Sequence, residues 1–127
     1  MKIDHAALYV EDLENARRFF TEMLGGTSNE LYHNKKTGFQ SYFITFDDGA
    51  RLEIMTRPGL LREDFQVPHT GYAHLAFNAG SREEVDRLSR ELEANGYPIM
   101  NGPRTTGDGY YESVIASVEG HPIEITI

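Results

Sequence analysis

Two stretches of seven residues, far apart in the chain, carry a similar pattern around a histidine. They are residues 3–9 and residues 72–78, and the second is an alternating run that repeats the first in modified form. In both, the histidine (His5 or His74) stands two residues before an alanine, with an apolar residue three positions after it. The two histidines are 69 positions apart (74 − 5). This repeat predicts two halves that fold in the same way.

A glutamate in each half strengthens the repeat. Glu53 and Glu124 each lie between two aliphatic residues, four positions after a glycine, and they are 71 positions apart (124 − 53). Both halves therefore carry a histidine and then a glutamate, in the same order and at nearly the same separation. We interpret the chain as a duplicated unit.

The first half reads as a strand, a helix and a hairpin. Residues 2–10 alternate as a strand does, and Asp12 can cap the helix that follows. That helix has an apolar face and is expected to stop at the glycine pair 25–26. Residues 39–46 and 50–56 read as strands joined by a turn at Asp47-Asp48-Gly49.

The second half repeats this order. Residues 71–78 read as a strand, and a helix capped by Ser81 follows, with its buried face expected at Val85, Leu88 and Leu92. A short strand is expected at 97–100 and a loop at 103–109. A hairpin of 111–118 and 121–127 completes the half.

The predicted fold class is α+β, with two βαβββ modules that form a curved, mixed-sheet cup. The first module is expected over residues 1–57 and the second over 71–127. A linker with two prolines and a glycine is expected between them, at 58–70.

Strand parity predicts where the repeated side chains lie. Side chains at odd spacing point to opposite faces of a strand. The aliphatic neighbours of Glu53 and Glu124 must face the helices, so both glutamates, with His5 and His74, are expected on the other face. A carboxylate in that position needs water, a partner or a metal. We therefore predict a metal site built from two histidines and two glutamates. The other histidines (His33, His69 and His121) fall in predicted loops or turns and are expected at the surface.

Composition excludes several classes of function. The 127 residues are 39% hydrophobic and carry a net charge of −8, which argues against a nucleic-acid or anionic-membrane partner. The absence of cysteine rules out disulfides, zinc ribbons and thiol catalysis. No apolar run approaches the roughly 20 residues of a membrane helix, and no signal-peptide pattern is present. We expect a cytoplasmic protein with a small-molecule substrate.

The chain resembles the vicinal-oxygen-chelate superfamily, which includes glyoxalase I, bleomycin- and fosfomycin-resistance proteins, extradiol dioxygenases and methylmalonyl-CoA epimerase. The resemblance spans the whole chain, and its most specific marks are residues 3–5, 49–54, 72–77 and 119–125. It is closest to the glyoxalase I branch, which uses His, Glu, His and Glu in this order. Extradiol dioxygenases and fosfomycin-resistance enzymes use a His, His, Glu pattern instead.

The resemblance implies that His5, Glu53, His74 and Glu124 bind one divalent metal. We expect zinc or nickel, with iron, cobalt or manganese as alternatives. It also implies that Glu124, or Glu53 and Glu124 together, carry a proton at the carbon beside a metal-polarised carbonyl, through a metal-stabilised enediolate. The implied reaction is that of a lactoylglutathione lyase-like enzyme, which converts a 2-oxoaldehyde–thiol hemithioacetal to a 2-hydroxyacyl thioester.

Two positions depart from glutathione-using glyoxalases. Tyr9 stands where those enzymes commonly have an arginine, and Arg57 stands where they often have an asparagine. We therefore expect another thiol adduct or another α-oxygenated carbonyl compound. Arg51, Tyr110 and Glu112 are the candidates for substrate contact.

Two alternatives remain open at this point. An epimerase could use the same proton shuttle, and a drug- or metabolite-binding protein like those of bleomycin resistance could use the cup without catalysis. The resemblance also implies a homodimer, with the modules paired within a chain or swapped between chains.

Overall fold

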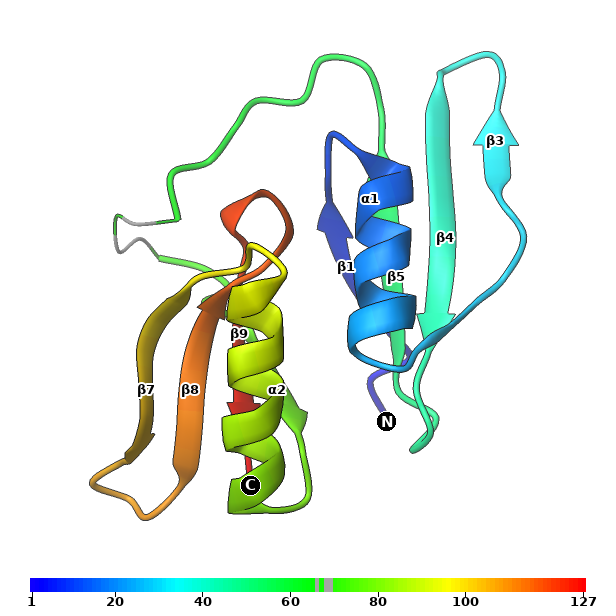
Figure 1. The fold of residues 1–127 in the computed structure, drawn as a ribbon. Helices are drawn as coiled ribbons and strands as arrows, with labels where there is room; N and C mark the ends of the chain where they lie inside the picture. Colours follow the sequence, from blue (N-terminus) through cyan, green and yellow to red (C-terminus); the bar gives the residue numbers. More distant parts are fainter. Residues whose placement is uncertain (66, 68–69) are drawn as a thin grey trace. The chain divides into compact units, whose positions relative to one another are not determined.

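The computed structural model describes residues 1–65, 67 and 70–127 (Figure 1). The chain divides into two compact units, Met1–Arg62 and Glu63–Ile127, whose positions relative to one another are not determined. Each unit combines helix with a mixed sheet, so the predicted α+β class is confirmed. The linker predicted at 58–70 includes residues 66, 68 and 69, which lie outside the described residues.

The first unit has one five-stranded sheet, in residues that are all described. Its order is β1-β5-β4-β2, and β3 also pairs with β4. β1 is parallel to β5, and the other pairs are antiparallel. The elements are β1 (Ala6–Tyr9), α1 (Leu13–Arg18), a π-helical turn η1 (Phe19–Met23), β2 (Thr27–Ser28), β3 (Tyr32–Asn34), β4 (Phe39–Thr45) and β5 (Arg51–Thr56).

The helix of the first unit begins where the sequence predicts. The Asp12 carboxylate accepts a hydrogen bond from the Asn15 backbone N–H at 2.9 Å, which satisfies one open donor of the first turn. Leu13 and Ala16 are the buried residues of α1, and the helix packs against β4 and β5. The helical path then widens into η1 before the chain turns at Gly25.

Two strands of the first unit were missed. Thr27–Ser28 and Tyr32–Asn34 both pair with β4, in a region where no strand was predicted. Strands of two and three residues are too short to show an alternating pattern, and their side chains are largely exposed.

The second unit has a four-stranded sheet of order β6-β9-β8-β7. β6 is parallel to β9, and the remaining pairs are antiparallel, as in the first unit. The elements are β6 (Leu75–Asn78), α2 (Arg82–Ala94), β7 (Ile99–Thr105), β8 (Tyr111–Ala116), a 3₁₀ turn η2 (Val118–Gly120) and β9 (Pro122–Thr126).

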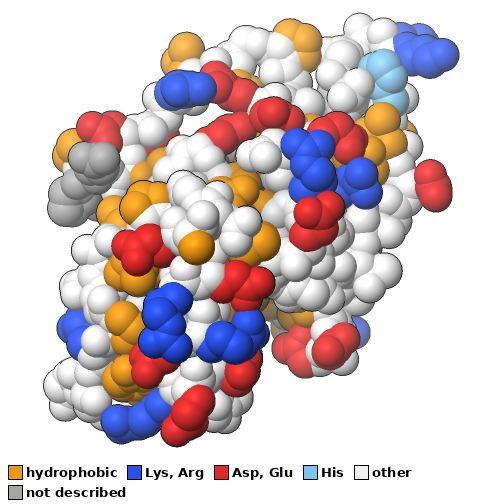
Figure 2. Space-filling model, in the orientation of Figure 1, with side chains coloured by type: hydrophobic (Ala, Val, Ile, Leu, Met, Phe, Trp, Pro, Cys, Tyr) orange, Lys and Arg blue, Asp and Glu red, His pale blue; other side chains and the backbone are white. Residues whose placement is uncertain are grey.

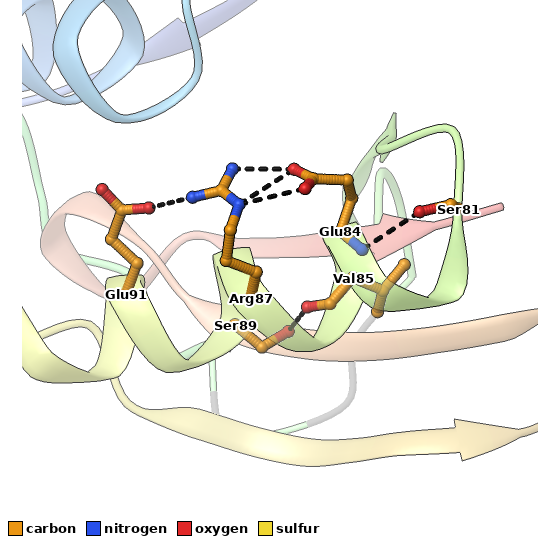
Figure 3. A network of polar contacts seen from close by, with 6 residues as sticks. All are labelled: Ser81, Glu84, Val85, Arg87, Ser89 and Glu91. Carbon is orange, nitrogen blue, oxygen red and sulfur yellow. Dashed lines mark hydrogen bonds and ion pairs between the residues drawn. The ribbon is translucent and has the colours of Figure 1, made fainter.

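Helix α2 is capped and charged on its outer side. The Ser81 hydroxyl accepts from the Glu84 backbone N–H at 3.2 Å, which confirms the predicted cap. Arg87 bridges Glu84 and Glu91 along the exposed face (Figure 3). Red and blue side chains are accordingly intermixed over this helix in Figure 2.

The inner side of α2 differs from the prediction at one position. Val85 and Leu92 are buried as expected, but Leu88 is only half-buried and Ser89 is fully buried. The Ser89 hydroxyl donates to the Val85 carbonyl at 2.6 Å (Figure 3) and is also hydrogen-bonded to Ser113 of β8. A serine reads as polar in a sequence, so this buried position was not recognised.

Strand β7 continues into residues that were predicted as loop. The prediction of a loop at 103–109 is wrong for residues 103–105, which belong to β7, with Arg104 and Thr105 paired to β8. Two register shifts between Ile99 and Arg104 accommodate the Gly102–Pro103 step. Gly102 has φ +87, and a Cβ there would collide with the Glu112 backbone, so the shift requires glycine.

The two sheets bury the aliphatic faces that strand parity predicts. Leu52 and Ile54 of β5 are buried, as are Ile123 and Ile125 of β9. Their alternate neighbours Glu53 and Glu124 therefore lie on the opposite faces. Among the described residues, no helix has the length and apolar character needed to cross a membrane.

Candidate metal centre

In the first unit, His5 and Glu53 approach one another across the β1–β5 pair. Ala7 lies beside Glu53 in the parallel register, and His5 is two residues earlier on the same face. His5 Nε2 is 3.8 Å from Glu53 Oε2. The Glu53 side chain is 17% exposed and that of His5 is 35% exposed, so the carboxylate is the more enclosed of the two.

In the second unit, His74 and Glu124 stand in the same relationship. Ala76 lies beside Glu124 in the parallel β6–β9 pair. His74 Nε2 is 3.1 Å from Glu124 Oε2, and the side chains are 38% and 18% exposed. The sequence repeat is thus matched by a repeated geometry, in which each histidine precedes a strand that runs parallel to the glutamate's strand.

The donors of each pair suit adjacent positions on one divalent ion. Zinc binds imidazole nitrogen and carboxylate oxygen at about 2.0–2.2 Å in tetrahedral geometry, so two adjacent ligands are about 3.3–3.6 Å apart. The His74–Glu124 separation is slightly shorter than that range, and the His5–Glu53 separation is slightly longer. Among the described residues, no three histidine, cysteine, aspartate or glutamate side chains gather as a metal-binding group. Each unit by itself holds two of the four predicted ligands.

His5 also contacts Asp4 and Phe43, and both of these residues contact Arg51. Its Nδ1 lies 2.8 Å from Asp4 Oδ2, which also accepts from Arg51 Nη1 at 3.2 Å. The hydrogen bond from His5 and the charge of Arg51 lower the pKa of Asp4. The Phe43 ring meets the His5 ring edge-on, with centroids 5.2 Å apart, and the Arg51 guanidinium lies 4.3 Å from the centre of the same Phe43 ring.

Two of the three residues predicted to contact substrate make side-chain contacts within their own units. Arg51 is held by Asp4 and Phe43, as described above. Glu112 is buried in β8 and paired with Arg104 Nη2 at 3.3 Å. Glu112 lies beside Thr126 in the β8–β9 register, which places it on the same sheet face as Glu124. Tyr110 is exposed, in the loop before β8.

The other histidines are placed as follows. His33 is exposed but lies in β3, where a loop was expected. His121 is half-buried at the end of the η2 turn, with its ring 4.3 Å from that of Phe65. His69 lies outside the described residues.

Three residues that contact candidate site residues were not recognised from the sequence. They are Asp4, which contacts His5, Phe43, which contacts His5 and Arg51, and Arg104, which contacts Glu112. Asp4 immediately precedes His5, and this adjacency was the available signal. Phe43 lies opposite Glu53, and Arg104 opposite Glu112, only because of the observed registers.

Comparison with protein families gives a match along almost the entire chain. A family model described as the Glyoxalase/Bleomycin resistance protein/Dioxygenase superfamily matches residues 2–125. The uncharacterised protein YqjT of Bacillus subtilis is 32% identical over 111 residues, which cover 84% of this chain and 84% of that protein.

Solved structures with the same fold include proteins with named activities. A glyoxalase family protein from Bacillus cereus is 20% identical, covers 99% of this chain and 93% of its own, and gives a TM-score of 0.86. The trypanothione-dependent glyoxalase I of Leishmania major is 19% identical, with coverages of 98% and 85% and a TM-score of 0.77. The fosfomycin resistance protein FosX of Listeria monocytogenes, in complex with Mn(II) and sulfate, is 19% identical, with coverages of 98% and 90% and a TM-score of 0.73. At these identities the likeness shows the fold.

Proposed function

Because this chain belongs to the glyoxalase/bleomycin resistance protein/dioxygenase superfamily, we propose that it is a metal-dependent isomerase of the glyoxalase I type. Its substrate would be the hemithioacetal of a 2-oxoaldehyde and a thiol, and its product a 2-hydroxyacyl thioester. The observation that carries this proposal is the repeated histidine–glutamate pair, with one pair in each unit, at 3.8 and 3.1 Å.

The proposed ligands of the ion are His5, Glu53, His74 and Glu124. Imidazole nitrogens and carboxylate oxygens suit zinc or nickel first, with iron, cobalt or manganese as alternatives. The spacing of the donors in each pair supports this assignment, and FosX, a structural neighbour, is known with Mn(II). When bound, such an ion polarises the substrate carbonyl.

Glu124 is the proposed proton carrier, with Glu53 as the second member of the pair. Its side chain is only 18% exposed, and its ion-pair partner in the structure is a histidine, not a permanently charged arginine or lysine. A carboxylate in this setting can take the proton from the hydroxyl-bearing carbon of the hemithioacetal and return it to the neighbouring carbonyl carbon, while the hydroxyl proton passes to the carbonyl oxygen. The isomerisation then needs no external oxidant or reductant.

Arg51, Tyr110 and Glu112 remain the proposed substrate contacts, with different roles. Tyr110 is exposed and could contact substrate directly. Glu112 is buried, so we propose that it acts through Arg104, which it holds on the sheet face that carries Glu124. We propose that the thiol part of the substrate is not glutathione, because Tyr9 and Arg57 stand where glutathione-using glyoxalases have an arginine and an asparagine.

Metal analysis and an isomerase assay test this function together. We expect the purified protein to carry about one divalent ion for each pair of units, measured by elemental analysis. We also expect the apoprotein to gain isomerase activity with methylglyoxal and a panel of thiols when zinc or nickel is restored. The double variant E53A/E124A should lose both the metal and the activity, whereas E93A on the outer side of α2 should retain both.

The same experiment separates the alternatives. A metal-loaded protein that exchanges the α-proton of a thioester with solvent, but does not isomerise hemithioacetals, would be an epimerase. A protein that binds no divalent ion would instead be a drug- or metabolite-binding member of the superfamily. Either result would overturn the glyoxalase I assignment.

We further propose that the protein is a cytoplasmic homodimer. Superfamily membership supports this assembly, in which the modules pair within a chain or swap between chains. Multi-angle light scattering of the metal-loaded protein should give twice the 14.4 kDa chain mass, and a monomer would contradict the proposal.

A further inference from the structure

The histidines of the two halves differ in their contacts. His74 follows an alanine, and its Nε2 is paired directly with Glu124 at 3.1 Å. His5 follows an aspartate, and its Nδ1 is bonded to that aspartate at 2.8 Å. Its Nε2 lies 3.8 Å from Glu53, which is too long for a hydrogen bond. The His5 ring is therefore held from the side opposite to its glutamate.

The contact with Asp4 determines which ring nitrogen carries the proton. A neutral imidazole has one N–H donor and one acceptor nitrogen, and an ionised carboxylate can only accept. The same oxygen, Asp4 Oδ2, accepts from Arg51 Nη1 at 3.2 Å, and a guanidinium can only donate, so this oxygen is an acceptor. Nδ1 of His5 must therefore be the donor. In the neutral ring the lone pair then lies on Nε2, which is the nitrogen that faces Glu53.

The rest of the cluster restricts the orientation of this ring. Phe43 meets the His5 ring edge-on, at an interplanar angle of 83°, and also stacks against Arg51. Phe43 lies opposite Glu53 in the β4–β5 register, and Arg51 lies two residues before Glu53 on the same strand face. One aromatic ring thus supports both the histidine and the arginine that holds Asp4.

We propose that Asp4, held by Arg51, is a positioning residue for His5: it fixes the Nδ1–H tautomer and directs the Nε2 lone pair towards Glu53 as a metal ligand. The metal-binding half of this statement rests on the proposed function, whereas the tautomer half concerns the metal-free protein. A hydrogen bond from a ligating histidine to a carboxylate commonly orients the ring and strengthens metal binding. An exposed aspartate–histidine contact without this role would contribute little.

The tautomer is measured directly in the apoprotein. Two-dimensional ¹H–¹⁵N correlation of the histidine rings, at a pH where they are neutral, should show His5 protonated at Nδ1. In D4N this preference should be lost and Nε2–H should become the main form, while D4E should restore it at least in part. His74 serves as the control within the same spectrum and should not change. D47N, an exposed aspartate of the same unit, should leave both rings as they are in the unaltered protein.

Metal affinity is then measured with Zn²⁺ alone by competition with a chromophoric chelator. We expect D4N to weaken zinc binding about 10-fold to 100-fold, R51Q to weaken it less, and D47N to have no effect. Predominant Nε2–H at His5 in the unaltered apoprotein, or a D4N variant with unchanged tautomer and affinity, would overturn the proposal. If the unaltered protein bound no zinc, the proposed metal-dependent function would fail, and the tautomer measurement would still decide the role of Asp4.

Discussion

Glu124 Oε2 lies 3.1 Å from His74 Nε2, the shorter of the two histidine–glutamate contacts that the repeat produces. This places a largely enclosed carboxylate beside an imidazole in the β6–β9 pair of strands. The relationship allows a test of the proposed proton transfer, because a glutamine at this position would keep an oxygen for the proposed metal ion but cannot carry a proton.

The variant E124Q is therefore expected to retain metal and lose turnover. General acid–base catalysis contributes about 10²- to 10⁴-fold, so we expect kcat to fall within that range while the metal content stays near that of the unaltered protein. Steady-state isomerase kinetics combined with elemental analysis would measure both quantities. E93Q, on the exposed side of α2, is the matched control. Full turnover in E124Q would contradict the role of Glu124 as proton carrier.

Metal addition is expected to stabilise the fold. A ligand that binds only the folded state adds about 2.7 kcal/mol when its concentration is 100 times its Kd. Thermal unfolding of the apoprotein should therefore shift to a higher Tm when zinc is added, and EDTA should reverse the shift. The variant H5A/H74A lacks both imidazoles and should show little response. An equal shift in that variant would place the ion elsewhere.

Acid and alkaline stability should depend on one tyrosine–glutamate contact in the first unit. The Tyr42 hydroxyl donates to Glu14 Oε1 at 2.5 Å and joins β4 to α1. This hydrogen bond lowers the pKa of Glu14 and raises the pKa of Tyr42. The stabilisation from a lowered carboxyl pKa is present above its ordinary value of 4.5 and is lost as the pH falls through the folded-state value. The stabilisation from the raised tyrosine pKa is present below 10.0 and is lost as the pH rises through the folded-state value.

Y42F should thus be less stable than the unaltered protein by about 1 kcal/mol at neutral pH. The difference should shrink towards both pH extremes, as measured by urea unfolding across the pH range. Y32F, at an exposed tyrosine of β3, provides the control. A difference that did not vary with pH would indicate a packing effect instead of this hydrogen bond.

The Arg104–Glu112 pair should be more costly to break than the charge network on α2. In R104M the buried Glu112 loses its cation, and we expect a loss of about 1–3 kcal/mol in the free energy of unfolding. The double variant R104M/E112Q should recover part of that loss, because no buried charge remains. R87M removes an exposed arginine that bridges Glu84 and Glu91, and it should cost less than about 1 kcal/mol. Chemical unfolding of the four proteins would test this, and equal losses in R104M and R87M would contradict it.

Strand parity and capping were predictable because each depends on near neighbours. Leu52 and Ile54 must be buried, so the face of Glu53 follows from alternation alone. The caps Asp12 and Ser81 were recognisable from residue type and position. These local rules led to the α+β class and to the shared orientation of histidine and glutamate within each half.

Features that depend on pairing partners could not be predicted in the same way. β2 and β3 form through hydrogen bonds to β4, and their own residues are too few to show the alternation of apolar and polar side chains that marks a strand. The extension of β7 past Pro103 depends on register shifts against β8. Arg51 reaches Asp4 only because β1 lies parallel to β5, which joins residues far apart in the sequence. Convergence of the four proposed ligands on one ion stays a prediction.

In each unit the histidine immediately precedes a strand at the edge of its sheet, and the neighbour of that strand, which is the last strand of the unit, carries the glutamate. Within the part of the chain that the structure describes, β1 pairs with β5 alone, and β6 pairs with β9 alone. During synthesis, each histidine therefore leaves the ribosome long before the strand that will hold it in place. A nascent or truncated chain that ends before Pro122 would lack Glu124 and would also leave β6 without a hydrogen-bonding partner. Completion of the sheet and assembly of the second donor pair are thus the same event.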